Sequence, residues 1–366
     1  MSSTKHYFSN LDASRFIAFI AVFLTHTFYS TDIEITQSSA FVFLQEHLQL
    51  GTLALHYFFV LSAFLITWII LEEYKNSGNF NPLYFLARRS LRIWPLYFLI
   101  VTLGFFVAYL FPSNDELPPL AYFLTFTLNF YIASNGYHFL FFLVFLWSIS
   151  VEEQFYFFWS FVLKHFKSYI MHICTILILV SLFFRYYFLD NDNQLMFNTL
   201  SSLSDFSIGA LAACIAFNKH TFFLKLIEMP RGLIVLVYVI FIANVALYHS
   251  IYANPTAVLF ENLIFALLYA FFILEQSFFN HSFFKIGFSS TLNYFGRISL
   301  GLYCYHGIVI TVVIKGLEHY HIITSPLQVF IIVPIIVFVS TVIVAIASHE
   351  LFEKRIAVLK NKFYPA

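Results

Sequence analysis

The chain has 366 residues, of which 60% are hydrophobic and only 10% are charged. Soluble domains carry about 25% charged residues, so this composition excludes an ordinary soluble protein. The 19 basic residues balance the 19 acidic ones, and the basic residues form no long tract. We therefore expect neither a nucleic-acid partner nor a polybasic segment that binds lipid headgroups.

Apolar segments recur along the whole chain and predict an all-α, polytopic bundle of transmembrane helices. A helix needs about 20 apolar residues to cross the ~30 Å of hydrocarbon in a bilayer. Segments of about this length or longer occupy 15–31, 51–71, 91–111, 119–163, 169–189, 197–217, 231–250, 255–275, 293–314 and 327–349. We expect about ten spans in contact with membrane lipids. Cys174, Cys214 and Cys304 lie singly in apolar runs, which indicates packing residues.

The segment 119–163 is too long for one ordinary helix, and Asn135-Gly136 interrupts it with a turn signal. Positive charge collects in short cytoplasmic loops, and it favours one crossing here over two. With one crossing, four basic groups share a side: Arg88, Arg89 and Arg92; Lys164 and Lys167; Lys219 and Lys225; and Lys354, Arg355, Lys360 and Lys362. Three acidic loops then share the other side: Asp32 with Glu34, Asp115 with Glu116, and Asp190 with Asp192. This arrangement predicts cytoplasmic termini and a re-entrant or interfacial segment near 119–140.

The first apolar segment contains an arginine and a histidine in the string RFIAFIAVFLTH. Arg15 and His26 lie eleven residues apart, which places them on nearly the same helix face, about 16 Å apart along the axis. An imidazole with a pKa of about 6.5 can take a proton from a hydroxyl at neutral pH. The alternative interpretation is an arginine at the membrane interface and a histidine bonded to a neighbouring carbonyl.

Three arginines stand before the third apolar segment in the string ARRSLRIWP. Arg88 and Arg92 are four residues apart and share a helix face, with Arg89 beside them. Guanidinium groups suit phosphate oxygens, so a phosphate-rich donor such as coenzyme A would fit this cluster. The alternative is a cluster that only anchors the helix on the cytoplasmic side.

Two glutamates interrupt an apolar stretch in the string WSISVEEQFYFFW. Glu152 and Glu153 point about 100° apart on a helix, so we expect only one of them to face a cavity. Glu152 lies about 18 Å along the helix from Lys164, near the predicted depth of His26. A carboxylate there could orient an imidazole base, or it could form a structural ion pair with an arginine.

The remaining histidines receive smaller roles. His306 lies in GRISLGLYCYHGIV with Ser299 and tyrosines nearby, and we expect it to support the site rather than to react. His319 and His321 stand close together without cysteine or carboxylate partners at ligand spacing, so we expect no metal site.

Taken in order, these segments resemble acyltransferase family 3, which includes O-acetyltransferases of lipopolysaccharide O-antigen, peptidoglycan and other glycans. The resemblance rests on LDASRFIAFIAVFLTH, GTLALHYFFVLSAFLIT, FLARRSLRIWPLYFL, WSISVEEQFYFFW, FSIGALAACIA, GRISLGLYCYH and HELFEKR. It implies acetyl-CoA or another acyl-CoA as donor, bound from the cytoplasm. It also implies a carbohydrate or lipid-linked glycan acceptor at the outer side of the bacterial inner membrane. One membrane acyltransferase domain would occupy 10–355 without a fused periplasmic hydrolase-like domain, followed by a short cytoplasmic tail at 356–366.

The resemblance also assigns site residues. The family's arginine and histidine match Arg15 and His26, and its glutamate matches Glu152, with Glu153 as the less certain position. Its basic cluster matches Arg88, Arg89 and Arg92. The sequence departs from the usual family pattern at His56, Ala63 and Ser160.

The resemblance implies a mechanism in which His26, oriented by Glu152, deprotonates an acceptor hydroxyl for attack on a thioester. The three clustered arginines would hold the donor phosphates, and Arg15 would bind phosphate or keep the inner mouth positive. An acyl-enzyme on Tyr156, or on a serine such as Ser148, stays open.

Two other classes stay open as well. A transporter or flippase could use buried histidine and glutamate as a proton relay, although the sequence shows no inverted repeat. A sensor or scaffold would not need four charged motifs. Labelling with acetyl-CoA separates the enzyme from both.

Overall fold

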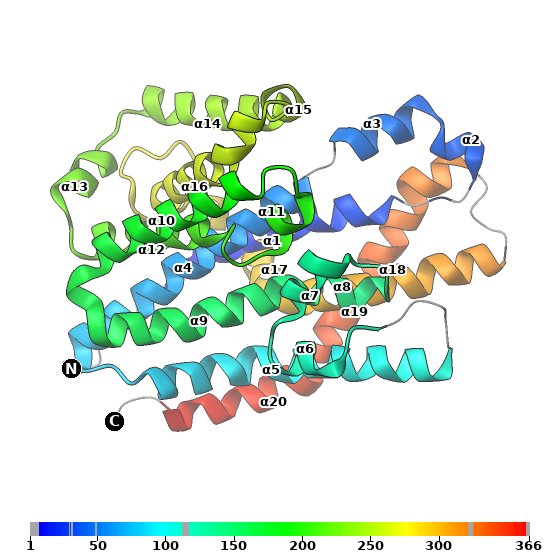
Figure 1. Ribbon diagram of the computed structural model, residues 1–366, viewed down its shortest axis with the longest axis horizontal. Helices are drawn as coiled ribbons and strands as arrows, with labels where there is room; N and C mark the ends of the chain where they lie inside the picture. Colours follow the sequence, from blue (N-terminus) through cyan, green and yellow to red (C-terminus); the bar gives the residue numbers. More distant parts are fainter. Residues whose placement is uncertain are drawn as a thin grey trace.

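The computed structural model describes residues 7–28, 30, 32–47, 50–111, 117–320 and 325–363, without the side chains of 45–47. In these ranges all regular secondary structure is helical, which confirms the predicted all-α bundle. The long helices are α1 (Ser9–Thr27), α4 (Leu50–Ser77), α5 (Pro82–Leu110), α9 (Leu146–Phe166), α10 (Ile170–Tyr187), α12 (Leu203–Phe217), α14 (Arg231–Ala246), α16 (Pro255–Phe278), α18 (Ser299–His319) and α19 (Val333–Ser348). Many of these helices run along the longest axis of the molecule (Figure 1).

Short helices connect the long ones or extend their ends. They are α2 (Ile33–Thr36), α3 (Ser39–His47), α6 (Leu120–Leu124), α7 (Leu128–Asn135), α8 (Phe141–Val144), η1 (Lys167–Tyr169), α11 (Asp192–Phe197), α13 (Thr221–Ile227), α15 (Tyr248–Ile251), η2 (Ile286–Phe288), α17 (Ser290–Arg297), η3 (Gln328–Ile332), η4 (His349–Glu353), α20 (Lys354–Ala357) and η5 (Val358–Phe363).

Six helical segments in the described part of the chain are long and apolar enough to cross a membrane. A seventh arises if α12 and α13, which are bent by 89° relative to each other, form one span. The predicted number of about ten spans is therefore not confirmed. One reason is that a single segment, Phe141–Tyr187, contains both α9 and α10. Its 47 residues would extend about 70 Å as one helix, more than twice the hydrocarbon thickness. Another is that α14, at 16 residues, is shorter than such a span.

The segment 119–163 contains three short helices followed by one long helix. The helices α6 and α7 have 5 and 8 residues, too few to cross a bilayer. Gly136 ends α7 with a φ of 79°, as the turn signal predicted. The Gln154 amide of α9 donates to the Phe126 carbonyl at 2.6 Å and to Asn129 Oδ1 at 2.8 Å, and it accepts from the Thr199 hydroxyl at 2.6 Å. These bonds satisfy polar groups at the broken helices, as a segment buried within a membrane protein requires.

Two close approaches hold the centre of the bundle together. A β-carbon at Gly209 of α12 would lie 2.1 Å from the Val60 carbonyl oxygen of α4. A β-carbon at Gly296 of α17 would lie 1.7 Å from the Asp12 carbonyl oxygen of α1. Small residues allow such backbone contacts between membrane helices, where packing replaces the hydrophobic effect as the main attraction. Both contacts position helices that carry the charged residues described below.

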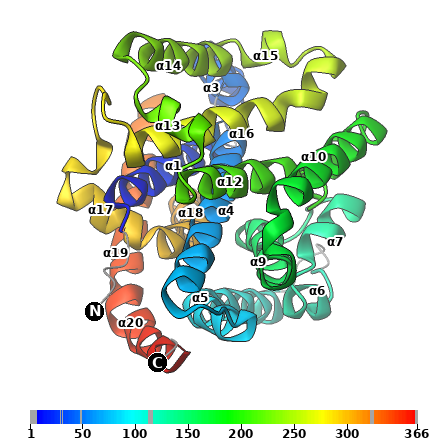
Figure 2. The same cartoon turned by 90° about the vertical axis from the view of Figure 1, so that its left-hand side faces the viewer.

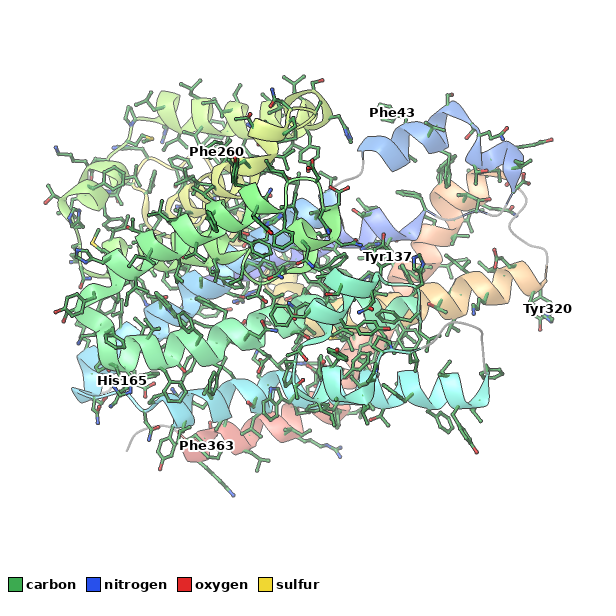
Figure 3. The ribbon with its side chains drawn as sticks, viewed as in Figure 1. Phe43, Tyr137, His165, Phe260, Tyr320 and Phe363 are labelled. Carbon is green, nitrogen blue, oxygen red and sulfur yellow. The ribbon has the colours of Figure 1, made fainter. Side chains whose placement is uncertain are left out.

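The predicted basic groups collect at one end of the molecule, which we call the basic end. The start of α5, the junction of α9 with α10, α13 and the end of η5 all lie at the left of Figure 1, and α20 leads into η5 from below the middle of α5. His165 and Phe363 mark this end in Figure 3, and Tyr320 lies at the opposite end. The acidic α2 also lies away from the basic end, whereas Asp115 and Glu116 fall outside the described residues. This arrangement matches a single crossing by 119–163.

Candidate active site

A cavity of about 980 Å³ opens at the basic end. This volume lies at the upper end of the range for small-molecule sites, which is about 300–1,000 Å³. Figure 2 looks onto this end and shows α1, α4, α5, α17 and α20, which contribute to the lining. Seven basic side chains line the cavity: Arg15, Arg88, Arg89, Arg92, Arg297, Lys354 and Lys360. Four carboxylates accompany them: Asp12, Glu72, Glu73 and Glu353. The excess of positive charge suits an anionic ligand, and we call this space the basic cavity.

The arginines of α5 have different partners within the basic cavity. Arg88 forms an ion pair with Glu73 at 2.5 Å and donates to the Phe363 carbonyl, also at 2.5 Å. Arg89 and Arg92 form no salt bridge with any carboxylate in the described ranges. The Arg89 guanidinium lies 5.7 Å from the centre of the Tyr156 ring. Arg89 and Arg92 are therefore better placed than Arg88 to bind an anion.

Arg15 belongs to the basic cavity through the start of α1. Its guanidinium pairs with Asp12 at 2.5 Å, one helical turn earlier, and the Tyr7 hydroxyl donates to the same carboxylate. Tyr57 of α4 donates to Ser14 beside them. Asp12 therefore fixes the position of the Arg15 guanidinium at the cavity wall and offsets part of its positive charge.

Glu152 hydrogen-bonds at both carboxylate oxygens. Ser62 of α4 donates to Oε1 at 2.7 Å, and Tyr156, one turn further along α9, donates to Oε2 at 2.7 Å. The structure does not bring Glu152 to His26. The rings around His26 include Phe145, which precedes Glu152 by seven residues, or about 10 Å along a helix. The predicted equal depth of Glu152 and His26 is therefore wrong by about 10 Å. Glu152 instead holds the Tyr156 ring against the Arg89 guanidinium.

Glu153 faces a different neighbour from Glu152, as the angle between adjacent helix residues predicts. The Trp94 indole of α5 donates to Glu153 Oε2 at 2.7 Å. The second oxygen, Oε1, is buried without a hydrogen-bond partner among the described residues. Glu153 therefore joins α9 to α5 and does not line the basic cavity.

His26 and His306 lie next to each other in the core, and we call them the histidine pair. Their ring centres are 5.9 Å apart, and the Phe145 ring lies 4.7 Å from His26 and 4.5 Å from His306. His306 Nδ1 bonds to the Tyr303 carbonyl, which only accepts, so Nδ1 must donate. In the neutral ring, Nε2 then carries the lone pair. This buried Nε2 has no hydrogen-bond partner in the described part of the chain.

Ser148 connects α9 to α18 beside the histidine pair. Its hydroxyl lies 2.8 Å from the Tyr303 hydroxyl, and both hydroxyls lie within 3.2 Å of the Phe145 carbonyl oxygen. Ser148 and Tyr156 thus already have hydrogen-bond partners. Their contacts hold the helices around the two predicted centres, the histidine pair and Glu152.

A second group of buried charges was not predicted as a group, and we call it the polar cluster. His56 of α4 bonds to Asp205 of α12 at 2.9 Å, and Arg185 of α10 lies 3.4 Å from Glu261 of α16. Arg185 also donates to the carbonyl oxygens of Val258 and Leu259 and to Ser201. The sequence did contain a signal, because each of these residues interrupts a predicted span, and intramembrane charges usually have partners.

The three cysteines are buried and free, as packing residues would be. Within the described ranges, no group of three histidine, cysteine or carboxylate side chains is arranged to hold a metal ion. His319 ends α18, whereas His321 falls outside the described residues.

A helical bundle with apolar spans, a basic cavity at one end and a buried histidine pair defines an integral membrane protein with a site suited to an anionic ligand. The model of acyltransferase family 3, described as an acyltransferase domain, matches residues 8–349, and the chain belongs to this family. It is therefore a membrane acyltransferase, and membership supports action on surface carbohydrates in general. No curated protein and no solved structure matches the chain.

Proposed function

We propose that this protein transfers an acyl group, most simply acetyl, from acyl-CoA to a hydroxyl of a cell-surface carbohydrate. Lipopolysaccharide O-antigen or an exopolysaccharide would be the acceptor, and the enzyme would lie in the bacterial inner membrane with the basic end and both termini in the cytoplasm. The observation that carries the proposal is the basic cavity, which lies on the same helices, α1 and α18, as the histidine pair.

The basic cavity would hold the phosphates of the donor. Guanidinium groups bind phosphate oxygens through parallel hydrogen bonds, and Arg89 and Arg92 have no competing salt bridge within the described residues. The stack of Glu152, Tyr156 and Arg89 keeps one of these guanidiniums in place. An anion entering from water would meet this excess of positive charge before it reached the core.

The helices that line the cavity continue to the histidine pair. Leu300 lines the cavity, and His306 follows it by six residues, or about 9 Å along α18. Arg15 lines the cavity, and His26 follows about 16 Å along α1. An extended pantetheine arm could cover such a distance, so the thioester would approach the histidine pair while the nucleotide remained at the basic end.

The histidine pair would then serve the chemical step. The acceptor oxygen forms a bond to the thioester carbonyl carbon, the carbon–sulfur bond breaks, and an imidazole of the pair takes the hydroxyl proton. The thiolate of CoA leaves and is protonated in turn. We assign His26 as the base and His306 as its partner, because the fixed Nδ1–H of His306 leaves its Nε2 free to accept a hydrogen bond.

The test is transfer of radiolabelled acetyl from acetyl-CoA to glycan by purified protein in lipid. His26→Ala should lower kcat by about 100-fold or more, because general bases contribute about 10²- to 10⁴-fold. His306→Ala should also lower it, whereas His165→Ala, an exposed histidine at the basic end, should not. Wild-type turnover in both core variants would refute the assignment of the histidine pair.

A transporter or flippase is the second candidate, and the polar cluster favours it. The pairs His56–Asp205 and Arg185–Glu261 connect four helices, and their histidine and two carboxylates are groups that can exchange protons in a relay. Proton-coupled movement of a glycolipid in liposomes, without CoA binding or acetyl transfer, would favour transport over the enzyme.

A further inference from the structure

The C-terminal segment Lys354–Phe363 is a wall of the basic cavity, although it follows the family match that ends at residue 349. It comprises α20 and η5, which pack along the first half of α5. Figure 1 shows this red segment beside α5 at the basic end. Six of its residues line the cavity: Lys354, Ile356, Ala357, Val358, Lys360 and Asn361. The sequence had suggested only a short tail from residue 356.

Arg88 connects this segment to the bundle. Its guanidinium donates to the Phe363 carbonyl oxygen and also pairs with Glu73 of α4, each at 2.5 Å. The Phe363 ring lies 6.0 Å from the Tyr84 ring, one turn before Arg88 on α5. A buried arginine between a carboxylate and a carbonyl is committed to structure, because breaking either contact leaves desolvated charge. Arg88 therefore holds the C-terminal segment in place.

The lysines of the segment differ in position. Lys354 pairs with Glu350 at 2.6 Å, so part of its charge is offset. Lys360 lines the basic cavity, whereas Lys362, two residues later, does not. Lys360 and Lys362 share the same charge, length and exposure class, and so they form a natural matched pair.

We propose that the C-terminal segment completes the donor site, with Lys360 contributing charge to a phosphate group of a nucleotide-bearing thioester and Arg88 positioning the segment. This inference rests on the proposed function, because it takes the basic cavity as the donor site. It assigns Arg88 a positioning role, in contrast to the phosphate-binding role expected from the motif of three arginines. Arg89, Arg92 and Lys360 then approach the ligand from two sides.

The test measures binding of coenzyme A to the full-length protein in detergent at low salt. Lys360→Gln should raise the Kd about fivefold, as expected for loss of one exposed ion pair, and added salt should reduce the difference. Lys362→Gln should leave the Kd within about twofold of the wild type. Equal effects of the two substitutions, with wild-type binding intact, would overturn the inference alone. No CoA binding by the wild type would overturn the proposed function and the inference with it.

The position of the segment has its own readout. Saturating coenzyme A should slow proteolysis within 354–363 in the wild type and in Lys362→Gln, and should slow it less in Lys360→Gln at the same concentration. Arg88→Gln should expose the segment to protease without ligand, while Arg89→Gln, its neighbour, should not. Proteolysis that neither coenzyme A nor Arg88→Gln alters would contradict the proposed wall.

Discussion

The basic cavity and the polar cluster both contain several ionisable side chains, but they differ in whether those side chains have oppositely charged partners. In the polar cluster each charged group meets a partner, as His56 meets Asp205 and Arg185 meets Glu261. In the basic cavity cations outnumber carboxylates, and Arg89 and Arg92 lack a salt bridge to any described carboxylate. Matched charges in a core connect helices, whereas unmatched charges at a surface cavity are available for a ligand. Mutations should therefore affect stability in one region and binding in the other.

The largest effect should come from breaking a matched pair. Arg185→Leu leaves Glu261 buried without its cation and should lower the free energy of unfolding by about 3–5 kcal/mol. Thermal unfolding in detergent measures this, with the exposed Arg231→Leu as control. Arg185→Leu combined with Glu261→Leu should recover part of the loss. A single variant as stable as the wild type would contradict the structural role of the pair.

Removing the unmatched arginines should affect binding instead. Arg89→Ala with Arg92→Ala should raise the Kd for coenzyme A at least about 100-fold, because hydrogen bonds to charged groups contribute about 1.5–3 kcal/mol each. The unfolding temperature should change little. Lys225→Ala, at the same end but outside the cavity, is the control. Unchanged affinity in the double variant would remove the cavity from the donor site.

A smaller loss of stability should follow from separating α4 and α12, the helices that carry His56 and Asp205. Gly209→Ala places a β-carbon against the Val60 carbonyl oxygen and pushes α12, with Asp205, away from α4, with His56. Overpacking costs about 1–3 kcal/mol, so the unfolding temperature should fall. Gly232→Ala, where no heavy atom lies within 4 Å of the new carbon, should not lower it. Equal behaviour of the two variants would show that the contact is not tight.

The smallest effect should come from an exposed ion pair. Glu350→Gln removes the partner of Lys354 on one helix face, and water already screens both groups. The unfolding temperature should not change measurably. A marked drop in the unfolding temperature would mean that the charged residues at this end stabilise the fold as well as lining the cavity.

Part of the site could be predicted because its signals are local. The intramembrane positions of His26 and Glu152 and the cluster at Arg88 stand out in single strings of sequence. Their partners could not be predicted, because depth along one helix does not give its rotation or tilt against another. His26 therefore meets His306 rather than Glu152, and Arg88, although it lines the cavity, contacts Glu73 and the Phe363 carbonyl.

The sequence by itself determined the all-helical membrane bundle, the non-crossing segment near 119–140 and the gathering of basic groups at one end. Hydropathy and loop charge decide these features, and both act on each segment separately. Tertiary structure alone decided which charges are matched, which remain available, and that residues 354–363 border the cavity. Those outcomes depend on close packing between segments hundreds of residues apart, such as Arg88 and Phe363, and no local pattern encodes that contact.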